Sequence, residues 1–272
     1  MKVLRRCKLS LSALFRVGTR KVRSAGRRAR WHLIEALEPR RRVRARGLSL
    51  TLQCDNWITQ FRTETLETKE PETLDWIDAQ VRDDDLFFDV GGNIGVITLY
   101  AALRCRRARV VVFEPEYSNL HLLRDNIVAN GLSARIQVYS IAIGDRTGLS
   151  RLHVQDLTPG AALHTESAGH LLVTDSGERV VLAEGTWAMK LDDFCEQAGL
   201  WPNALKIDVD GGEGRVLAGA KETLSRPELR SVLLEAGAAG LRPEAYDLLR
   251  HAGFSRDDTV QRSEAVNEVW VR

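Results

Sequence analysis

The sequence predicts a doubly wound α/β domain built on a mostly parallel, seven-stranded sheet. Short, almost continuously apolar runs, such as residues 86–90 and 110–113, alternate with segments whose apolar residues have helical spacing. Nearly continuous apolar strands that alternate with helices are typical of parallel sheets covered on both faces. Two further strands, around Phe254 and at residues 268–271, predict an antiparallel hairpin at the C-terminus.

The elements follow one another in a regular order. Alternating leucines predict a short strand at residues 48–52, and three- and four-residue spacing predicts a helix at 72–81. The core strands are expected at residues 86–90, 110–113, 136–139, 204–209 and 231–234. Helices are expected at residues 96–103, 118–131, 192–198, 213–224 and 243–251, with Ser118 as the cap of the second. Right-handed crossovers then place these helices on both faces of the sheet.

Two regions fall outside this rhythm. Residues 1–46 contain sixteen Lys or Arg and two acidic residues, a net charge of +14, whereas the rest of the chain carries −12. We interpret them as a basic N-terminal extension that precedes a single domain at residues 47–272. Residues 146–190 mix Gly, Ser and Thr with short alternating segments, and they are interpreted as an insert before the fourth core strand. A loop or hairpin is expected there, over the active site.

Composition excludes several classes of protein. No run of eighteen apolar residues is present, which argues against a membrane-spanning helix, and the first residues lack the pattern of a signal peptide. Four scattered cysteines without a CxxC pair argue against a zinc site or a disulfide framework. We therefore expect a cytoplasmic protein.

The basic extension leaves alternatives open. Its apolar residues fall roughly on one helical stripe among Lys and Arg, which is typical of peripheral membrane contact through residues 1–30 or of an organelle-targeting presequence. A solvated, partly disordered tail fits the same residues equally well. Nucleic-acid binding is disfavoured, because no aromatic residues interleave with the charges of residues 16–30.

Functional residues are expected where strands end, because ligands of such sheets bind at the carboxyl ends of the strands. The first core strand reaches Asp89, and the run Asp89-x-Gly91-x-Asn93-x-Gly95 joins it to a helix. Glycines at such a turn let a ligand approach the backbone. Glu114 ends the second strand, and a carboxylate there can accept two hydrogen bonds from ribose hydroxyls.

The acid at the start of the loop bears on the choice of cofactor. Dinucleotide enzymes also place an acid after their second strand, so Glu114 does not discriminate between cofactors. Asp89 would repel a pyrophosphate, but it suits the ammonium and sulfonium groups of S-adenosylmethionine. These residues favour S-adenosylmethionine, with a nicotinamide-dependent oxidoreductase as the alternative.

A cluster of acids ends the fourth core strand, where Asp208, Asp210 and Glu213 fall within six residues. A hydroxyl that attacks a sulfonium methyl group needs a base as its proton leaves. We expect Asp208 to be the central acid, as base or as anchor for cofactor or substrate. Glu213 is the second candidate, although helix capping also suits it. Asp208 and Glu235 end adjacent strands and form the alternative, a divalent-metal site, which we rank below a metal-free mechanism.

The insert offers three further ionisable groups, His153, His164 and His170. Each is an alternative base, because imidazole titrates near neutral pH. A surface position in a loop is the simpler interpretation of each.

Six segments in order resemble the FkbM family of methyltransferases, over about residues 60–272. They are FFDVGGNIGVITLYAA, VVFEPEYSNLHLLRDNIVANGL, AIGDRTG, MKLDDF, KIDVDGGEGRVLAGA and the C-terminal NEVWVR. The resemblance implies a class I methyltransferase sheet, which is Rossmann-like with a C-terminal hairpin, and S-adenosylmethionine as cofactor. Family members typically methylate hydroxyl groups. It thus implies an acceptor with a free hydroxyl, on a sugar, a glycan, or a glycosylated or polyketide natural product.

The resemblance also implies roles for single residues. The methionine part of the cofactor would be held by Asp89, Gly91, Gly92, Asn93 and Gly95, the ribose by Glu114, and the adenine would lie near Ser140 and Ala142. Gly92 stands where Ala is usual, and Asp210 stands where Glu is commoner, which shortens that carboxylate by one methylene. A catalytically silent binding module descended from such an enzyme is the second alternative.

Overall fold

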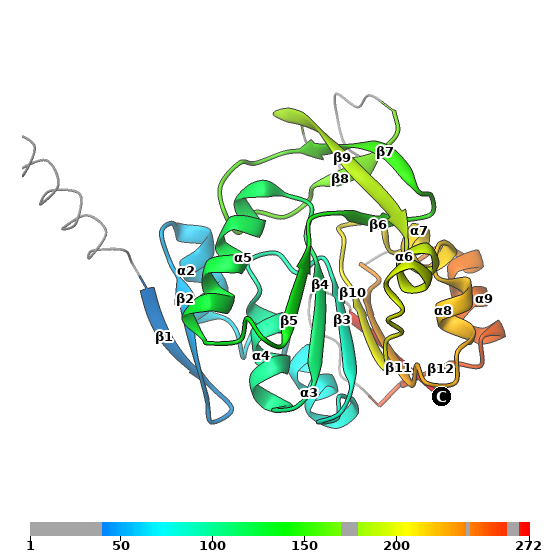
Figure 1. The fold of residues 1–272 in the computed structure, drawn as a ribbon, viewed down its shortest axis with the longest axis horizontal. Coiled ribbons are helices and arrows are strands. Elements are labelled where there is room, and N and C mark those ends of the chain that lie inside the picture. Colours follow the sequence, from blue (N-terminus) through cyan, green and yellow to red (C-terminus); the bar gives the residue numbers. More distant parts are fainter. Residues whose placement is uncertain (1–39, 170–178, 238–239, 260–266) are drawn as a thin grey trace, which may run out of the picture. The chain divides into compact units, whose positions relative to one another are not determined.

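The computed structural model describes residues 40–169, 179–237, 240–259 and 267–272 (Figure 1). The described residues belong to one compact unit, Arg40–Arg272. The predictions for residues 1–30, and His170, therefore lie outside the described residues.

The central sheet has seven strands in the order β12-β13-β11-β10-β3-β4-β5. Five strands are parallel: β3 (Leu86–Val90), β4 (Arg109–Phe113), β5 (Ile136–Tyr139), β10 (Ala204–Ile207) and β11 (Ser231–Glu235). β13 (Asn267–Val271) runs antiparallel to β11, and β12 (Ser255–Arg256) pairs antiparallel with β13. The predicted doubly wound, mostly parallel sheet with its C-terminal hairpin is confirmed.

Successive side chains of the core strands pack into two hydrophobic cores, one on each face of the sheet. Phe87, Val110 and Val112 face one core, which also contains buried residues of α3 (Pro71–Gln80), α4 (Val96–Arg104) and α5 (Tyr117–Ala129). Phe88 and Phe113 face the other, with α6 (Leu191–Ala198), α7 (Glu213–Ala218), α8 (Lys221–Ser225) and α9 (Pro243–His251). Burial on both faces explains why these strands are apolar at nearly every position.

Two local predictions about the helices were wrong. The cap of α5 is Glu116 and not Ser118, because the Glu116 side chain accepts a hydrogen bond from the backbone N–H of Asn119. The single helix expected at 213–224 is divided into α7 and α8 at Gly219. A Cβ atom on Gly219 would lie 2.0 Å from the carbonyl oxygen of Gly144, so the chain turns where only glycine fits.

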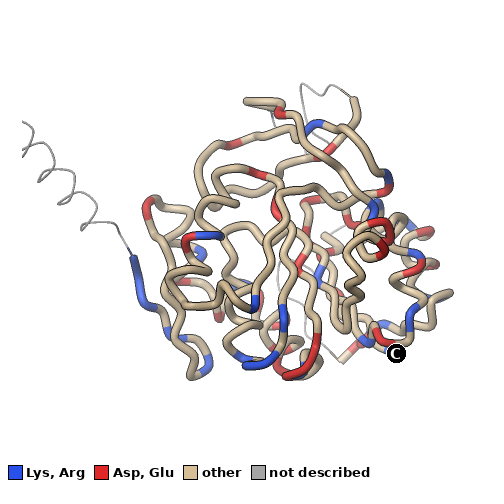
Figure 2. The backbone as a smooth tube through the Cα atoms, viewed as in Figure 1, with Lys and Arg blue, Asp and Glu red and all other residues tan. Residues whose placement is uncertain are grey.

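An N-terminal hairpin precedes the sheet. β1 (Arg40–Ala45) pairs antiparallel with β2 (Leu48–Gln53), and α2 (Trp57–Glu64) follows with a capping box formed by Asn56 and Thr59. β1 belongs to the segment that was predicted to be a basic extension, and Figure 2 shows it as a basic stretch. Neither β1 nor α2 was predicted.

The insert forms a sheet of its own. Its strands are β7 (Gly148–Val154), β8 (Thr165–Ser167) and β9 (Leu182–Lys190). They are joined by β6 (Ala142–Gly144), which lies just before the insert, in the order β6-β9-β7-β8. This sheet lies over the carboxyl ends of the central strands (Figure 1). The insert is therefore larger in structure than the predicted loop or hairpin, and it covers the edge where ligands of such folds bind. Within the described ranges, no helix has both the length and the apolar character needed to cross a membrane.

Candidate functional site

The loop between β3 and α4 brings bare backbone to the neighbouring strands. Gly91, Asn93 and Gly95 have positive φ angles of 85°, 48° and 88°. A Cβ atom on Gly91 would lie 1.7 Å from the carbonyl oxygen of Asp208, so this position admits only glycine. A Cβ atom on Gly92 would lie 2.1 Å from Cγ2 of Val112, so glycine suits this position.

Asp89 lies beneath the loop and is fully buried. Its Oδ2 accepts a hydrogen bond from Thr98 Oγ1 at 2.5 Å, and its Oδ1 lies 3.3 Å from Nζ of the buried Lys206. That ion pair lacks hydrogen-bond geometry, so Oδ1 has no hydrogen-bond donor among the described residues. Asp89 lines a cavity with about 540 Å³ of empty space, together with Lys206 and the glycine loop. Its charge is therefore partly compensated within the protein, and one oxygen is left for a ligand.

Glu114 follows β4 and is buried beside the loop. Its Oε2 accepts a hydrogen bond from the Asn93 N–H at 2.7 Å, and its Oε1 accepts one from the Glu116 N–H at 2.9 Å. Burial raises the pKa of Glu114 to about 7, and these two hydrogen bonds oppose the rise. The carboxylate is thus held in one orientation at the wall of the larger cavity.

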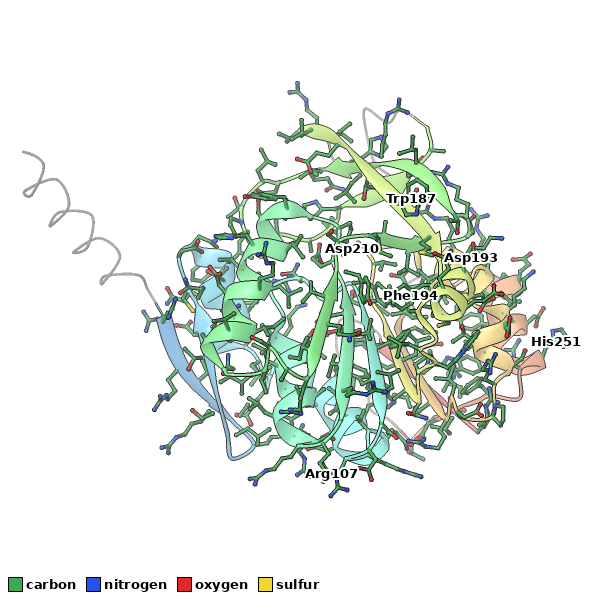
Figure 3. The ribbon with its side chains drawn as sticks, in the orientation of Figure 1. Arg107, Trp187, Asp193, Phe194, Asp210 and His251 are labelled. Carbon is green, nitrogen blue, oxygen red and sulfur yellow. The ribbon has the colours of Figure 1, made fainter. Side chains whose placement is uncertain are left out.

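Three carboxylates meet at the ends of β10 and β11. Oxygen atoms of Asp208, Asp210 and Glu235 lie within 4.8 Å of one another, a set that could hold a metal ion. Figure 3 shows Asp210 at the end of the central strands that faces the insert, with Arg107 at the opposite end. The predicted meeting of Asp208 and Glu235 is therefore present, and Asp210 joins them.

The three carboxyl groups of this cluster differ in pKa. Burial opposes ionisation of Asp208, but the ammonium of Lys206, 3.0 Å away, holds the pKa of Asp208 below its usual value. Burial and the neighbouring charge of Asp208 raise the pKa of Glu235 well above its usual value. Burial and the same charge raise the pKa of Asp210 to about 6. Near neutral pH, Asp208 is therefore ionised, Asp210 is mostly ionised and Glu235 is protonated.

Glu213 has a structural role that differs from that of the three clustered carboxylates. Its Oε1 accepts hydrogen bonds from the backbone N–H groups of Val209 at 3.0 Å and Gly211 at 3.2 Å. Glu213 is buried, and among the described residues it is not part of the cavity wall. It therefore holds the turn that carries Asp208 and Asp210, in keeping with the capping interpretation.

The strap, residues 155–164 of the insert, crosses the same edge. The Ala161 carbonyl accepts hydrogen bonds from Nδ2 of Asn93 at 2.8 Å and of Asn119 at 3.1 Å. Arg62 of α2 donates from Nε to the Gly160 carbonyl at 2.6 Å. Oδ2 of Asp210 accepts a hydrogen bond from the Leu163 N–H at 2.6 Å. The strap thus connects the glycine loop, α2, α5 and the acidic turn, which is the turn after β10 that carries Asp208 and Asp210.

A second connection joins the insert sheet to the domain beneath it. The buried Glu166 forms ion pairs with Arg146 at 3.0 Å and with Arg215 of α7 at 2.8 Å. Glu166 and Arg215 both line the larger cavity. The acidic cluster, Asp208, Asp210 and Glu235, lines the same cavity.

The larger cavity contains about 900 Å³ of empty space and is open to solvent. Its wall includes Gly91, Asn93, Glu114, Ala142, Asp208, Asp210 and Glu235 among the predicted residues. Ser140 is exposed and, within the described part of the chain, does not belong to this wall, whereas Ile141 does. Of the histidines, His164 lines the cavity and His153 is buried in the insert sheet, with Nδ1 3.2 Å from the Thr165 carbonyl oxygen.

Several residues of the wall were not predicted. Arg62, Lys69 and Glu70 come from the segment before β3, and Glu116 follows Glu114 by two positions. No spacing or motif marked the first three. Glu116 was within reach of sequence reasoning, because it follows a strand end that was already identified.

The order of the central sheet, the antiparallel β13 beside β11, and the glycine loop followed by an acid after the next strand define a class I methyltransferase fold. The Methyltransferase FkbM domain matches residues 89–256, and the chain belongs to this family. The expected resemblance is thereby confirmed. Membership of a methyltransferase family argues against the nicotinamide-dependent alternative.

The chain is similar to several known proteins. It is 31% identical to 31-O-demethyl-FK506 methyltransferase FkbM of Streptomyces tacrolimicus over 204 residues, covering 65% of this chain and 75% of that protein. It is 28% identical to 2-O-methyltransferase NoeI of Sinorhizobium fredii over 154 residues, covering 53% of this chain and 60% of that protein. A crystal structure of methyltransferase FkbM from Methylobacillus flagellatus has a TM-score of 0.48 and 16% identity, covering 80% of this chain and 56% of that one.

Proposed function

We propose that the protein is an S-adenosylmethionine-dependent O-methyltransferase. The observation that carries this proposal is the position of Glu114. Its carboxylate is fixed by two backbone N–H groups, beside a glycine loop and at the wall of a large cavity. A carboxylate held there can accept hydrogen bonds from the two hydroxyls of a ribose. The names of two relatives, a 31-O-demethyl-FK506 methyltransferase and a 2-O-methyltransferase, support transfer to oxygen.

The residues around the loop fit the cofactor. Gly91 lines both cavities, and its lack of a side chain lets the loop pack directly against the backbone of Asp208. Oδ1 of Asp89, which lies 3.3 Å from Lys206 Nζ but has no hydrogen-bond donor among the described residues, can accept a hydrogen bond from the ammonium group of the methionine part. We assign the methionine part to Asp89, Gly91, Gly92, Asn93 and Gly95, the ribose to Glu114, and the adenine to the wall formed by Ala142, with the exposed Ser140 at its margin. When bound, this cofactor supplies an electrophilic methyl group.

The acidic cluster is assigned to the acceptor. A hydroxyl oxygen must be placed at roughly 3 Å from the methyl carbon, and orientation supplies much of the rate. Asp208 is ionised and held by Lys206, so it can accept a hydrogen bond from the acceptor hydroxyl and orient it. The pKa of Asp210, about 6, is closer to neutral pH, which suits the group that takes the proton. Glu213 supports the turn beneath both.

A divalent metal at Asp208, Asp210 and Glu235 is the alternative to this mechanism. Carboxylate oxygens are ligands that Mg²⁺ prefers, so the donor set fits such an ion. Two observations favour the metal-free mechanism. Lys206 already pairs with Asp208, and Asp210 already accepts the Leu163 N–H.

The acceptor is proposed to be a small molecule or glycan with a free hydroxyl, such as a sugar or a glycosylated or polyketide natural product. The support is the size of the cavity and its mixed wall. Arg62, Lys69 and Arg215 are hydrogen-bond donors there, and Glu70 and Glu166 are acceptors. Such a wall suits an acceptor with several hydroxyl groups.

Calorimetric titration of the purified full chain with S-adenosylmethionine and S-adenosylhomocysteine tests cofactor binding. Transfer of a radiolabelled methyl group to a panel of hydroxylated acceptors tests the reaction. We expect Glu114→Gln to weaken binding of S-adenosylhomocysteine by about tenfold or more, because an amide NH₂ would face a backbone N–H. The exposed Glu244→Gln is the matched control. Absence of binding by the unmodified chain would refute the proposal. Binding without turnover on any acceptor would instead favour a catalytically silent module.

A further inference from the structure

Glu116 is a buried carboxylate with one oxygen unused. The residue is 1% exposed and lines the larger cavity. Its Oε2 caps α5 by accepting the Asn119 N–H at 2.7 Å, whereas Oε1 has no hydrogen-bond partner among the described residues. A buried carboxylate oxygen without a partner is unfavourable, because its lost hydration is not replaced. A ligand donor in the cavity would replace it.

His164 of the strap has a complementary unused atom in the same cavity. The backbone N–H of Gln155 donates to Nδ1 at 3.4 Å, so the neutral ring carries its proton on Nε2. Burial lowers the pKa of His164 and keeps the ring neutral, although the nearby charge of Glu116 opposes this shift. Nε2 is buried and without a partner in the described part of the chain. It is therefore an unused hydrogen-bond donor on a residue that lines the same cavity as the unused acceptor of Glu116.

Glu116 and His164 lie at the nucleoside end of the site, which is the part of the cavity near Glu114. The Glu116 N–H donates to Oε1 of Glu114, the carboxylate assigned to the ribose. Ile141 and Ala142 contribute apolar wall to the same cavity. An apolar wall suits the faces of a purine ring, and polar atoms at its rim suit the edge.

We infer that Glu116 and His164 recognise the amino edge of the adenine, an inference that rests on the proposed cofactor. The 6-amino group of adenine is a donor, and the ring nitrogen beside it is an acceptor. Oε1 of Glu116 accepts from the amino group, and Nε2 of His164 donates to the ring nitrogen. Hypoxanthine and guanine present an oxygen and an N–H at these positions, which is the reverse arrangement. The pair thus selects adenosyl over inosyl or guanosyl ligands.

The experiment compares S-adenosylhomocysteine with S-inosylhomocysteine by calorimetric titration of the full chain. The unmodified chain is expected to bind the adenosyl compound about 10- to 100-fold more tightly, since hydrogen bonds to charged groups are involved. Glu116→Gln keeps one carbonyl oxygen to cap α5 but presents NH₂ to the cavity. It should weaken the adenosyl compound, strengthen the inosyl compound, and so reduce this ratio about tenfold or more.

Two further variants complete the test. His164→Phe keeps a ring of similar size without the donor, and it should also reduce the ratio. His121→Gln, at an exposed position on α5, should leave the ratio unchanged. Circular dichroism and thermal unfolding of each variant establish that α5 is intact. An unchanged ratio in folded Glu116→Gln, or equal affinity of the unmodified chain for both compounds, would overturn the inference. Binding of neither compound by the unmodified chain would be a failure of the proposed function instead.

Discussion

Lys206 is the cation on which two carboxylates of the site depend, and Lys206→Met tests that dependence. Its Nζ lies 3.3 Å from Oδ1 of Asp89 and 3.0 Å from Oδ2 of Asp208. Lys206 and Asp89 are buried, so a methionine of similar length would leave the charge of Asp89 uncompensated. Removal of one partner of a buried ion pair costs about 3–5 kcal/mol. We expect a loss of that size in the free energy of unfolding near neutral pH.

The pH dependence of this loss follows from two pKa shifts. The pKa of Asp208 is lowered in the folded protein, so its contribution is present above its unfolded value of 3.8 and is lost as pH falls. The pKa of Lys206 is raised, because the two carboxylates outweigh burial, so its contribution persists at all pH values below 10.5. In Lys206→Met the pKa of Asp208 should rise, and protonation then relieves the unpaired charge. The deficit of the variant should therefore shrink as pH is lowered.

Urea unfolding followed by tryptophan fluorescence, at about pH 7 and about pH 4, measures this difference. Lys221→Met, at an exposed position on α8, is the control and should change stability by less than about 0.5 kcal/mol. Asp89→Asn added to Lys206→Met should recover part of the loss. A deficit that is equal at both pH values, or no larger than that of the control, would refute the charge argument.

Three further predictions concern the loop and the acidic cluster. Gly91→Ala should destabilise the protein by about 2 kcal/mol or more and abolish cofactor binding in calorimetry. The control is Gly131→Ala, where no atom lies within 4 Å of the new Cβ. It should lose only about 1 kcal/mol of stability and still bind the cofactor. The turnover number should rise with pH through about 6, because Asp210 acts as a base only when ionised, and Asp210→Asn should lower it by about 100-fold and remove this dependence. A turnover number that does not rise through about pH 6 argues against Asp210 as the base. Treatment with EDTA should leave the methyl-transfer rate unchanged, and restoration of a lost rate by Mg²⁺ would favour the metal alternative.

The central sheet could be predicted because burial on both faces leaves a plain signature. The strands β3, β4, β10 and β11 are nearly continuous in apolar residues, and the functional acids lie at their carboxyl ends or directly after them. The position of Asp89, Glu114 and Asp208 at one edge follows from parallel pairing alone, since β10 and β4 both pair with β3. No other part of the chain has so strong a pattern.

The elements that were missed have weaker signatures for identifiable reasons. β1 consists mostly of arginines with exposed side chains, so its composition is that of a basic tail. The strands β7, β8 and β9 of the insert have partly exposed side chains, and β8 has only three residues. Tertiary hydrogen bonds to the strap determine the positions of Arg62 and Asn119, and they have no local sequence pattern. The role of Glu213 likewise depends on a turn geometry that its neighbours alone do not reveal.

The strap has a consequence for attempts to exchange acceptor specificity between relatives. Its Ala161 carbonyl is shared by the glycine loop and α5, and Leu163 is held by the acidic turn. An insert transferred to another family member would therefore lose the hydrogen bonds that hold its strap, unless the recipient has equivalents of Asn93, Asn119 and Asp210. Chimeras that keep each insert together with these three side chains preserve both ends of the crevice, whereas a transplanted insert alone would alter the nucleoside pocket along with the acceptor pocket.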